Sequence, residues 1–230
     1  MLDLNGLKGG LIVSCQAGAE SPLAKPEILA AMALAGEQAG AVGIRANGPA
    51  NVSAIAAMVT VPIIGIYKLD VPGYEVYITP TFKEAAEIAA AGASIIALDA
   101  TNRPRPGPDD TRRLIARIHD ELGVRVMADI STLAEGVAAA EAGADIVAST
   151  MSGYTPYTAD RHNIAGPDLE LIRMLTNRVK VPVVCEGRVH RPDEARAALE
   201  AGAYAVVVGT AITATGWIAQ QYVKAMKGNI

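Results

Sequence analysis

Two charged residues, Lys68 and Glu186, each follow an unbroken apolar run that is typical of a buried strand. The run before Lys68 is PIIGIY, and the run before Glu186 is VPVVC. A lysine at such a place can serve as a base, because apolar surroundings disfavour the ammonium form and lower its pKa. A carboxyl group close to it can hold a polar group of a bound molecule or pass on a proton. Proton transfer is therefore the chemistry that this pair suggests.

Polar residues also close most of the other predicted strands. The predicted strand ends are Gln16, Arg45, Lys68, Asp99, Asp129, Thr150, Glu186 and Gly209. Structural roles remain open for individual members, since Asp129 could cap the next helix and Arg45 could form an ion pair. Seven polar ends of both charge signs nevertheless indicate a lined pocket, with Gln16, Arg45, Asp99, Asp129 and Thr150 as candidate substrate contacts beside the catalytic pair.

A repeated unit explains how these ends could converge. Four segments join a helix-like stretch to a strand-like run through AGA, with central glycines at 40, 92, 143 and 202. Glycine after a helix end is typical of an α-to-β connection. Three further strand entries (TVPIIGIYK, GVRVMADIS and KVPVVCEGRV) and GGLIVSCQ bring the number of strands to eight.

Stretches with apolar residues at three- and four-residue steps lie between the strands, as in DDTRRLIARIHDELG and PDLELIRMLTNRV. Eight strand–helix units in 230 residues predict a single (β/α)8 TIM barrel domain over 1–230, similar to ribulose-phosphate-binding barrels. A doubly wound sheet is the alternative, but the chain has no GxGxxG motif. The carboxyl ends of barrel strands share one face, and the two-residue period places Ile64 and Ile66 on the side of Lys68.

Composition excludes several classes of function. The chain is 51% hydrophobic and 19% charged with a formal net charge of -4, and it has no basic run longer than a dipeptide. Nucleic acid is therefore not an expected partner. No segment predicts a signal peptide or a membrane span, and Cys15 and Cys185 read as buried thiols. A cytoplasmic protein without a metal site is expected.

Glycines after the last two strands suggest a phosphate site. Gly187, Gly209 and Thr210 could offer backbone N–H groups to a phosphate, and Arg188 could supply a counter-charge. Tyr154, in the loop MSGYTPYTADRHN, could close over a ligand. Barrels without a phosphate ligand also carry glycines here, so the pattern leaves both readings open.

The chain resembles the N-acetylmannosamine-6-phosphate 2-epimerase family of bacterial sialic-acid catabolism. The resemblance covers essentially the whole chain through GGLIVSCQ, SPLAKPEILAAMALA, EQAGAVGIR, VPIIGIYK, the RPRP loop, SGYT, EGR and VGTAIT. It implies conversion of N-acetylmannosamine 6-phosphate to N-acetylglucosamine 6-phosphate without a nucleotide, metal or other cofactor. It also implies Lys68 as catalytic base or acid, Glu186 as its partner, and Gln16, Arg45 and Asp129 as substrate contacts.

One position departs from the resemblance. Family members usually carry a phosphate-contacting arginine directly after the VG-x-AIT segment, and here that position is Ala214. Arg188 or a loop arginine could take over, phosphate binding could be weaker, or the substrate could differ.

Epimerisation at carbon 2 fits the residues, because in the open-chain sugar that proton is alpha to an aldehyde and its removal gives an enolate. A Schiff-base class I aldolase using Lys68 and a non-catalytic sugar-phosphate-binding barrel are the alternatives.

The final stretch GWIAQQYVKAMKG predicts an amphipathic helix that either closes the barrel wall or packs on a second subunit, so a homodimer is expected.

Overall fold

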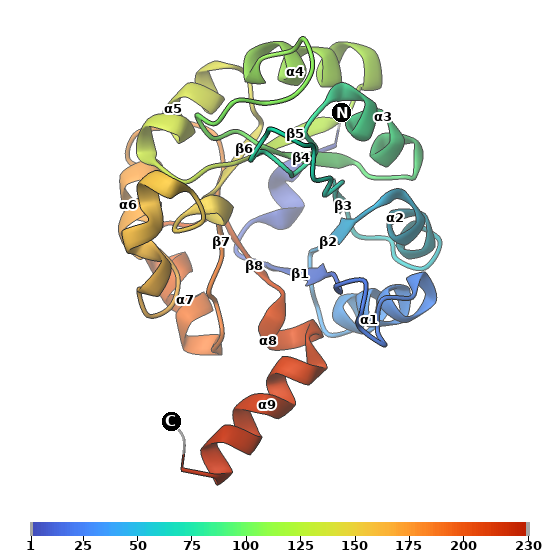
Figure 1. Cartoon of the computed structure of the whole chain (residues 1–230), viewed down its shortest axis with the longest axis vertical. Helices are drawn as coiled ribbons and strands as arrows, with labels where there is room; N and C mark the ends of the chain where they lie inside the picture. Colours follow the sequence, from blue (N-terminus) through green and yellow to red (C-terminus); the bar gives the residue numbers. More distant parts are fainter. Residues whose placement is uncertain (1, 229–230) are drawn as a thin grey trace.

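The computed structural model describes residues 2–228, which form a closed barrel of eight parallel strands surrounded by helices (Figure 1). The strands are β1 (Leu11–Cys15), β2 (Gly43–Asn47), β3 (Ile63–Ile66), β4 (Ile95–Asp99), β5 (Arg125–Asp129), β6 (Ile146–Ala148), β7 (Val183–Glu186) and β8 (Ala205–Val208). Pairing of β8 with β1 closes the sheet and confirms the predicted (β/α)8 fold. The predicted domain of 1–230 includes residues 1 and 229–230, which lie outside the described part.

The helices alternate with the strands as the apolar periodicity predicts. They are α1 (Pro26–Gln38), α2 (Pro49–Ala56), α3 (Phe82–Ala90), α4 (Thr111–Arg117), α5 (Leu133–Glu141), α6 (Leu169–Thr176), α7 (Pro192–Glu200), α8 (Thr210–Thr213) and α9 (Thr215–Met226). Capping boxes at Thr81 and Thr132 start α3 and α5. Gly143, between α5 and β6, has φ +104°, a conformation that glycine adopts without the steric penalty of a side chain.

Apolar side chains fill the barrel interior on alternate strand positions. Ile64 and Ile66 of β3 and Val184 of β7 are fully buried in one interior cluster, which confirms the predicted faces. The opposite faces of the strands pack against the surrounding helices in a second, larger cluster. Because the side-chain period is two, the positions that follow this interior layer point into the barrel mouth.

Several predicted strand ends need correction. Asp99, Asp129 and Glu186 are the last residues of their strands, as predicted. Arg45 instead lies inside β2, which continues to Asn47, and Lys68 lies two residues beyond β3. The remaining differences are that Gln16 and Gly209 each follow their strand by one residue and that Thr150 lies in a 3-10 helix, η3 (Ser149–Met151). Sequence patterns locate the face of a strand more reliably than its last ladder hydrogen bond.

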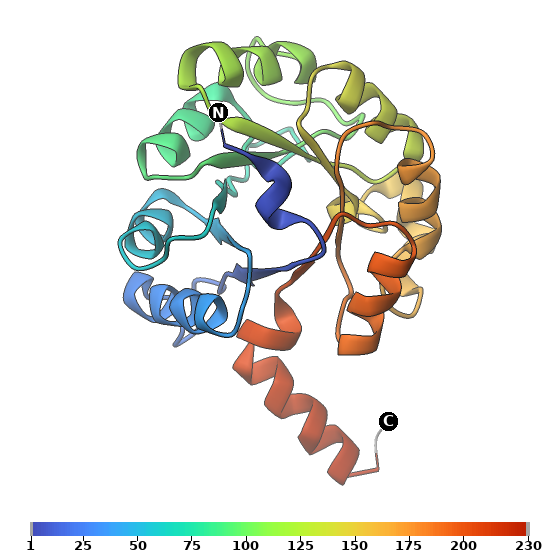
Figure 2. The same cartoon turned by 180° about the vertical axis from the view of Figure 1, so that it is seen from behind.

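The N-terminal segment closes the amino end of the barrel. Figure 2 shows it crossing the side opposite to the view in Figure 1. Its 3-10 helix η1 (Leu4–Leu7) buries Leu7 in the interior cluster, and the Tyr204 hydroxyl donates to the Leu4 carbonyl. The barrel therefore opens at its carboxyl end.

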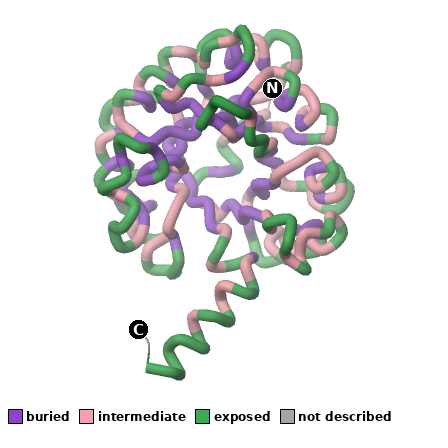
Figure 3. Tube along the Cα trace, viewed as in Figure 1, coloured by how far each residue is buried: buried purple, intermediate pink, exposed green. Residues whose placement is uncertain are grey.

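Helix α9 is arranged differently from the other helices. It projects away from the barrel, and none of its residues is buried (Figures 1 and 3). Tyr222 is 70% exposed and Met226 is 86% exposed. The predicted role of this stretch in closing the barrel wall is therefore wrong.

The two cysteines, Cys15 and Cys185, are buried free thiols, as expected. Burial raises the pKa of each to about 12, so neither is a reactive thiolate. Within residues 2–228, no helix has the length and apolar character needed to cross a membrane.

Candidate active site

A cavity of about 310 Å³ opens at the carboxyl end of the barrel. Nine of the residues predicted for the site line it: Gln16, Lys68, Thr150, Tyr154, Glu186, Gly187, Arg188, Gly209 and Thr210. Its volume lies at the lower end of the range of about 300–1,000 Å³ that holds small molecules. The other three predicted residues, Arg45, Asp99 and Asp129, do not line this cavity.

Arg45 and Asp129 form a buried ion pair at the end of the barrel interior. The guanidinium nitrogens Nη1 and Nη2 donate to the two carboxylate oxygens over 3.1 and 2.6 Å, and the Thr150 hydroxyl donates to Oδ1 over 2.6 Å. Burial by itself would lower the pKa of Arg45, but Asp129 and Glu186 raise it above its ordinary value. Arg45 therefore remains a fixed positive charge.

Glu186 shares this cation but is not satisfied by it. Its Oε2 lies 3.1 Å from Arg45 Nη1, yet this contact lacks hydrogen-bond geometry. Nη1 already directs its N–H groups at Asp129 Oδ1 and Met127 Sδ. Burial, reinforced by repulsion from Asp129 and opposed by Arg45 and Lys68, raises the pKa of Glu186 to about 7. Its carboxyl can therefore hold or release a proton near neutral pH.

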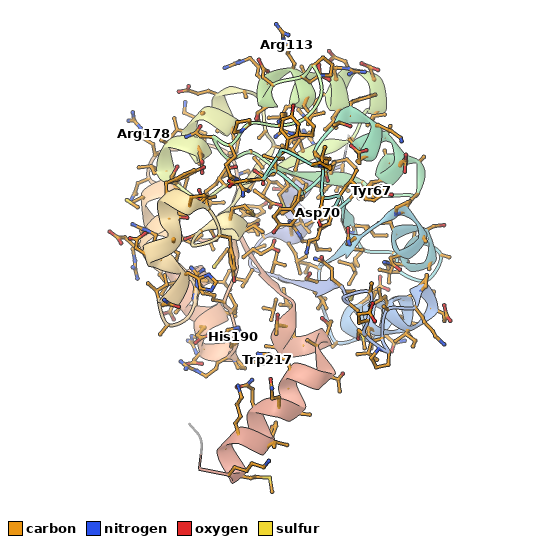
Figure 4. All side chains as sticks on the ribbon, viewed as in Figure 1. Tyr67, Asp70, Arg113, Arg178, His190 and Trp217 are labelled. Carbon is orange, nitrogen blue, oxygen red and sulfur yellow. The ribbon has the colours of Figure 1, made fainter. Side chains whose placement is uncertain are left out.

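Lys68 is placed by a hairpin that crosses the barrel mouth after β3. The chain returns through an antiparallel bridge between Lys68 and Ile78, and the Leu69 N–H donates to the Tyr77 carbonyl. The Lys68 N–H donates to Asn47 Oδ1 over 2.8 Å, which ties the hairpin to β2. Figure 4 labels Asp70, a hairpin residue beside the barrel opening.

The ammonium of Lys68 enters the cavity without a partner. Within residues 2–228 it forms no salt bridge, and its pKa is lowered because surrounding protein displaces water and Arg45 repels its charge. Glu186 and Asp129 oppose this shift. The side chain remains accessible from solvent through the cavity mouth. Lys68 is thus a free amine whose neutral form is favoured relative to an ordinary lysine.

Asp99 has a different environment, although it also ends a barrel strand. Its Oδ1 accepts from the N–H and hydroxyl of Thr101, and its Oδ2 accepts from Arg103 Nη2 over 2.6 Å. Arg105 donates to the Asp99 carbonyl. The structure therefore places Asp99 as the anchor of the loop after β4, and its predicted contact with substrate remains a prediction.

Two loops form the end of the cavity predicted to hold phosphate. Within residues 2–228, the N–H groups of Gly187, Arg188, Gly209 and Thr210 have no acceptor. Gly187 has φ +107°, and a Cβ at Gly209 would lie 3.2 Å from the Ser14 Cβ. The Arg188 guanidinium is held by the carbonyls of Ser152 and Gly166 over 2.6 and 3.0 Å. These unpaired donors suit an anion.

Sequence reasoning missed several lining residues. Ser14 and Tyr77 line the cavity, as does Thr213 next to the unpaired N–H groups, whereas Ala214, which also lines it, had been noted in the sequence. The alternation YEVYIT, with Val76 and Ile78 buried on either side of Tyr77, was the signal that the loop turns back as a strand-like segment. His190 also lines the cavity, although the sequence analysis did not propose it as a site residue.

Unsatisfied polar atoms mark this site as built for a ligand. Among the described residues, the buried side-chain atoms without a hydrogen-bond partner are Gln16 Oε1, Arg45 Nε and Glu186 Oε2. Buried polar groups are normally paired, so Gln16 Oε1 and Glu186 Oε2, which belong to residues lining the cavity, are places where a bound molecule can contribute. A larger groove of about 570 Å³ lies between the loop after β4 and α5, but its buried carboxylate Glu135 is fully engaged.

Known proteins resemble this chain over nearly its whole length. A family model described as "Putative N-acetylmannosamine-6-phosphate epimerase" matches residues 29–228. A protein of Thermosynechococcus vestitus is 52% identical over 223 residues, which cover 97% of this chain and 96% of that protein. One from Clostridium perfringens is 44% identical over 227 residues, covering 99% and 100%. Both carry the name "Putative N-acetylmannosamine-6-phosphate 2-epimerase".

Two solved structures have folds similar to that of this chain. The N-acetylmannosamine-6-phosphate 2-epimerase from Clostridium perfringens matches with a TM-score of 0.90 at 44% identity, covering 99% of this chain and 96% of that one. A thiamine phosphate pyrophosphorylase from Pyrococcus furiosus, with a TM-score of 0.59 and 19% identity, covers 91% of this chain and 88% of its own. That second likeness concerns the fold alone.

Proposed function

The chain belongs to the N-acetylmannosamine-6-phosphate epimerase family, and we propose that it interconverts N-acetylmannosamine 6-phosphate and N-acetylglucosamine 6-phosphate. In enzyme nomenclature this is an N-acylglucosamine-6-phosphate 2-epimerase of amino-sugar and sialic acid catabolism. The observation that carries the proposal is the unpaired Lys68 amine beside the fixed charge of Arg45 in a cavity with unsatisfied polar atoms.

We assign the proton transfers to Lys68. In the open-chain sugar, the neutral amine removes the proton from carbon 2, and the electron pair of that C–H bond passes into the carbonyl to give an enolate. The positive charges of Arg45 and the new ammonium stabilise the enolate oxygen. The ammonium, whose protons exchange with solvent at the cavity mouth, then delivers a proton to the opposite face of carbon 2. Since Lys68 has no partner among the described residues, its side chain is free to follow carbon 2 between the two faces.

Glu186 acts as a substrate-holding group in this scheme. Its buried Oε2 needs a donor that Arg45 does not supply, and an acetamido N–H or a sugar hydroxyl provides one. Its charge also influences Lys68, because an ionised carboxylate favours the ammonium form. Asp129 keeps Arg45 oriented through the bidentate pair.

Phosphate recognition is assigned to the end of the cavity formed after β7 and β8. Four unpaired N–H groups there suit a dianion, and Tyr154 lies over the neighbouring wall with its ring 5.9 Å from the Arg188 guanidinium. No step of this scheme calls for a cofactor, because an enolate next to two cations needs only proton transfer.

An assay in deuterated water tests the proposed reaction. Epimerisation by deprotonation places deuterium at carbon 2 of the product, which ¹H NMR detects as loss of the H2 signal. Conversion without deuterium at carbon 2 would exclude an enolate exchanging with solvent. Trapping of a covalent adduct on Lys68 by borohydride would favour the Schiff-base alternative instead.

A second copy of this chain is the partner that we propose for α9. Tyr222, Val223 and Met226 are 70%, 47% and 86% exposed, so this helix presents an apolar surface that the barrel does not cover. Light scattering should give a dimer mass for the wild type, and Tyr222→Ser with Met226→Ser should shift it toward the monomer. A monomeric wild type would contradict this.

For location we propose the cytoplasm, where buried thiols such as Cys15 stay reduced.

A further inference from the structure

The cavity contains a side chain that the proposed mechanism has not used. His190, in the loop between β7 and α7, lines the cavity together with Gly209, Thr210 and Ala214. Within residues 2–228, neither of its ring nitrogens has a hydrogen-bond partner. An imidazole on a cavity wall that also carries unpaired backbone N–H groups adds a further donor to this end of the cavity.

Aromatic stacking fixes the position of this imidazole. The ring of Trp217, in the first turns of α9, lies 5.0 Å from the His190 ring between centroids, with an angle of 32° between the planes. Figure 4 shows the two residues side by side between α7 and α9. The His190 N–H donates to Glu194 Oε2 over 2.7 Å, so the backbone is also held by the start of α7. Both the backbone and the ring of His190 are thereby oriented.

Other cationic groups at this end are absent or engaged. Ala214 lines the cavity with only a methyl group. Arg188 donates from Nε and Nη1 to two backbone carbonyls, which leaves Nη2 as its free nitrogen. Among the described residues, His190 is thus an imidazole at this end whose ring nitrogens are free, as are the hydroxyls of Thr210 and Tyr154.

We propose that His190 binds the phosphate of the substrate and that Trp217 positions it by stacking, at the end of the cavity where Ala214 offers only a methyl group. This inference rests on the proposed sugar-phosphate site and adds the residues that recognise its anion. An imidazole N–H donates to phosphate oxygen whether the ring is neutral or charged, and stacking reduces the rotamer freedom lost on binding. Helix α9, which carries Trp217, is then part of the substrate site.

Kinetic constants of variants test the assignment. His190→Ala should raise KM for N-acetylmannosamine 6-phosphate about 10-fold, the loss of one hydrogen bond to a charged group, and leave kcat within about twofold. Inorganic phosphate should weaken as a competitive inhibitor by the same factor. Trp217→Ala should show a smaller rise in KM, and Trp217→Phe should restore most of it. Gln220→Ala, an exposed change on the same helix, serves as the matched control.

Calorimetric binding separates this proposal from the proposed reaction. N-acetylglucosamine 6-phosphate and N-acetylglucosamine are titrated into wild type and His190→Ala, and only the phosphorylated sugar should lose affinity in the variant. This comparison holds even if the protein shows no turnover. Equal KM, inhibition by phosphate and affinity in wild type and His190→Ala would overturn the assignment. A lower melting temperature of Trp217→Ala with unchanged KM would reduce the stack to a structural contact and overturn the role of Trp217.

Discussion

Glu186 and Asp99 are acidic residues at the ends of barrel strands, and burial raises the pKa of both, yet their partners differ. Asp99 accepts three hydrogen bonds from Thr101 and Arg103, all within one loop. Glu186 instead has an unpaired Oε2 facing a cavity. We call the first group, Asp99 with Thr101, Arg103 and Arg105, the loop anchor. The second, Arg45 with Lys68, Asp129 and Glu186, is the mouth cluster.

The difference between the two groups shows how a barrel uses one kind of residue for two purposes. The residues of the loop anchor form hydrogen bonds with one another, so a substitution in this group should lower the free energy of unfolding. In the mouth cluster, the Lys68 amine and Glu186 Oε2 have no partner among the described residues, so a substitution in this group should lower kcat. Functional sites often contain buried polar or charged groups that lack a hydrogen-bond or ion-pair partner within the protein.

The largest expected effect is on turnover in Lys68→Ala. Loss of the base should lower kcat by about 10³-fold, while circular dichroism and melting temperature stay as in the wild type. Lys83→Ala on α3, where the lysine side chain is 79% exposed, is the matched control. A kcat within tenfold of the wild type would remove Lys68 from the chemistry.

Glu186→Gln and Asp99→Asn compare the two groups directly. Glu186→Gln should lower kcat/KM about 100-fold without loss of stability, since a buried unpaired carboxyl becomes neutral. Asp99→Asn should lower the free energy of unfolding by about 2 kcal/mol, because charge-assisted hydrogen bonds to Arg103 and Thr101 are lost. Urea denaturation and steady-state kinetics measure both. Loss of stability in Glu186→Gln together with loss of kcat/KM in Asp99→Asn would contradict the distinction between the two groups.

The pH dependence of kcat/KM should separate the two groups further. Activity rises with pH as Lys68 loses its proton, and Glu186 and Asp129 hold that pKa up against the effects of burial and Arg45. Removing the Glu186 charge lowers the pKa of Lys68 further, so in Glu186→Gln the rising limb should move to lower pH. Asp99→Asn should leave this limb in place. A limb that moves to higher pH in Glu186→Gln would contradict the assigned sign.

The smallest expected effect belongs to Thr101→Val. This change removes the hydroxyl that donates to Asp99 Oδ1 and accepts from Arg103 Nε, and it leaves the hydrogen bonds from the Thr101 N–H and Arg103 Nη2 to Asp99. Stability should fall by about 1 kcal/mol, with KM and kcat unchanged. A clear rise in KM would show that the loop after β4 contributes to the site.

Much of this arrangement was predictable from the sequence because it depends on periodicity. Alternation within strands placed Lys68 and Glu186 on the face of Ile64, Ile66 and Val184, and a closed barrel brings such positions to one mouth. The split between the loop anchor and the mouth cluster was not predictable. It depends on which donors reach Asp99 from its own loop. The conformation of that loop cannot be deduced from the hydrophobic periodicity of the sequence.

Long-range contacts account for the other omissions. Tyr77 reaches the cavity because a hairpin folds back over the mouth and bridges at Lys68. His190 lines it next to a residue of α9, 27 positions further along the chain. The sequence left α9 either as a wall of the barrel or as a contact with a second subunit, because the apolar pattern of a helix does not say which surface it will face.

The stack of Trp217 on His190 also has a spectroscopic consequence. Trp217 is the only tryptophan in the sequence, so the indole fluorescence of this protein comes from a single ring at the edge of the cavity. A ligand that contacts His190 changes the surroundings of that ring. The emission of the unlabelled protein should therefore follow the occupancy of the site in a simple titration.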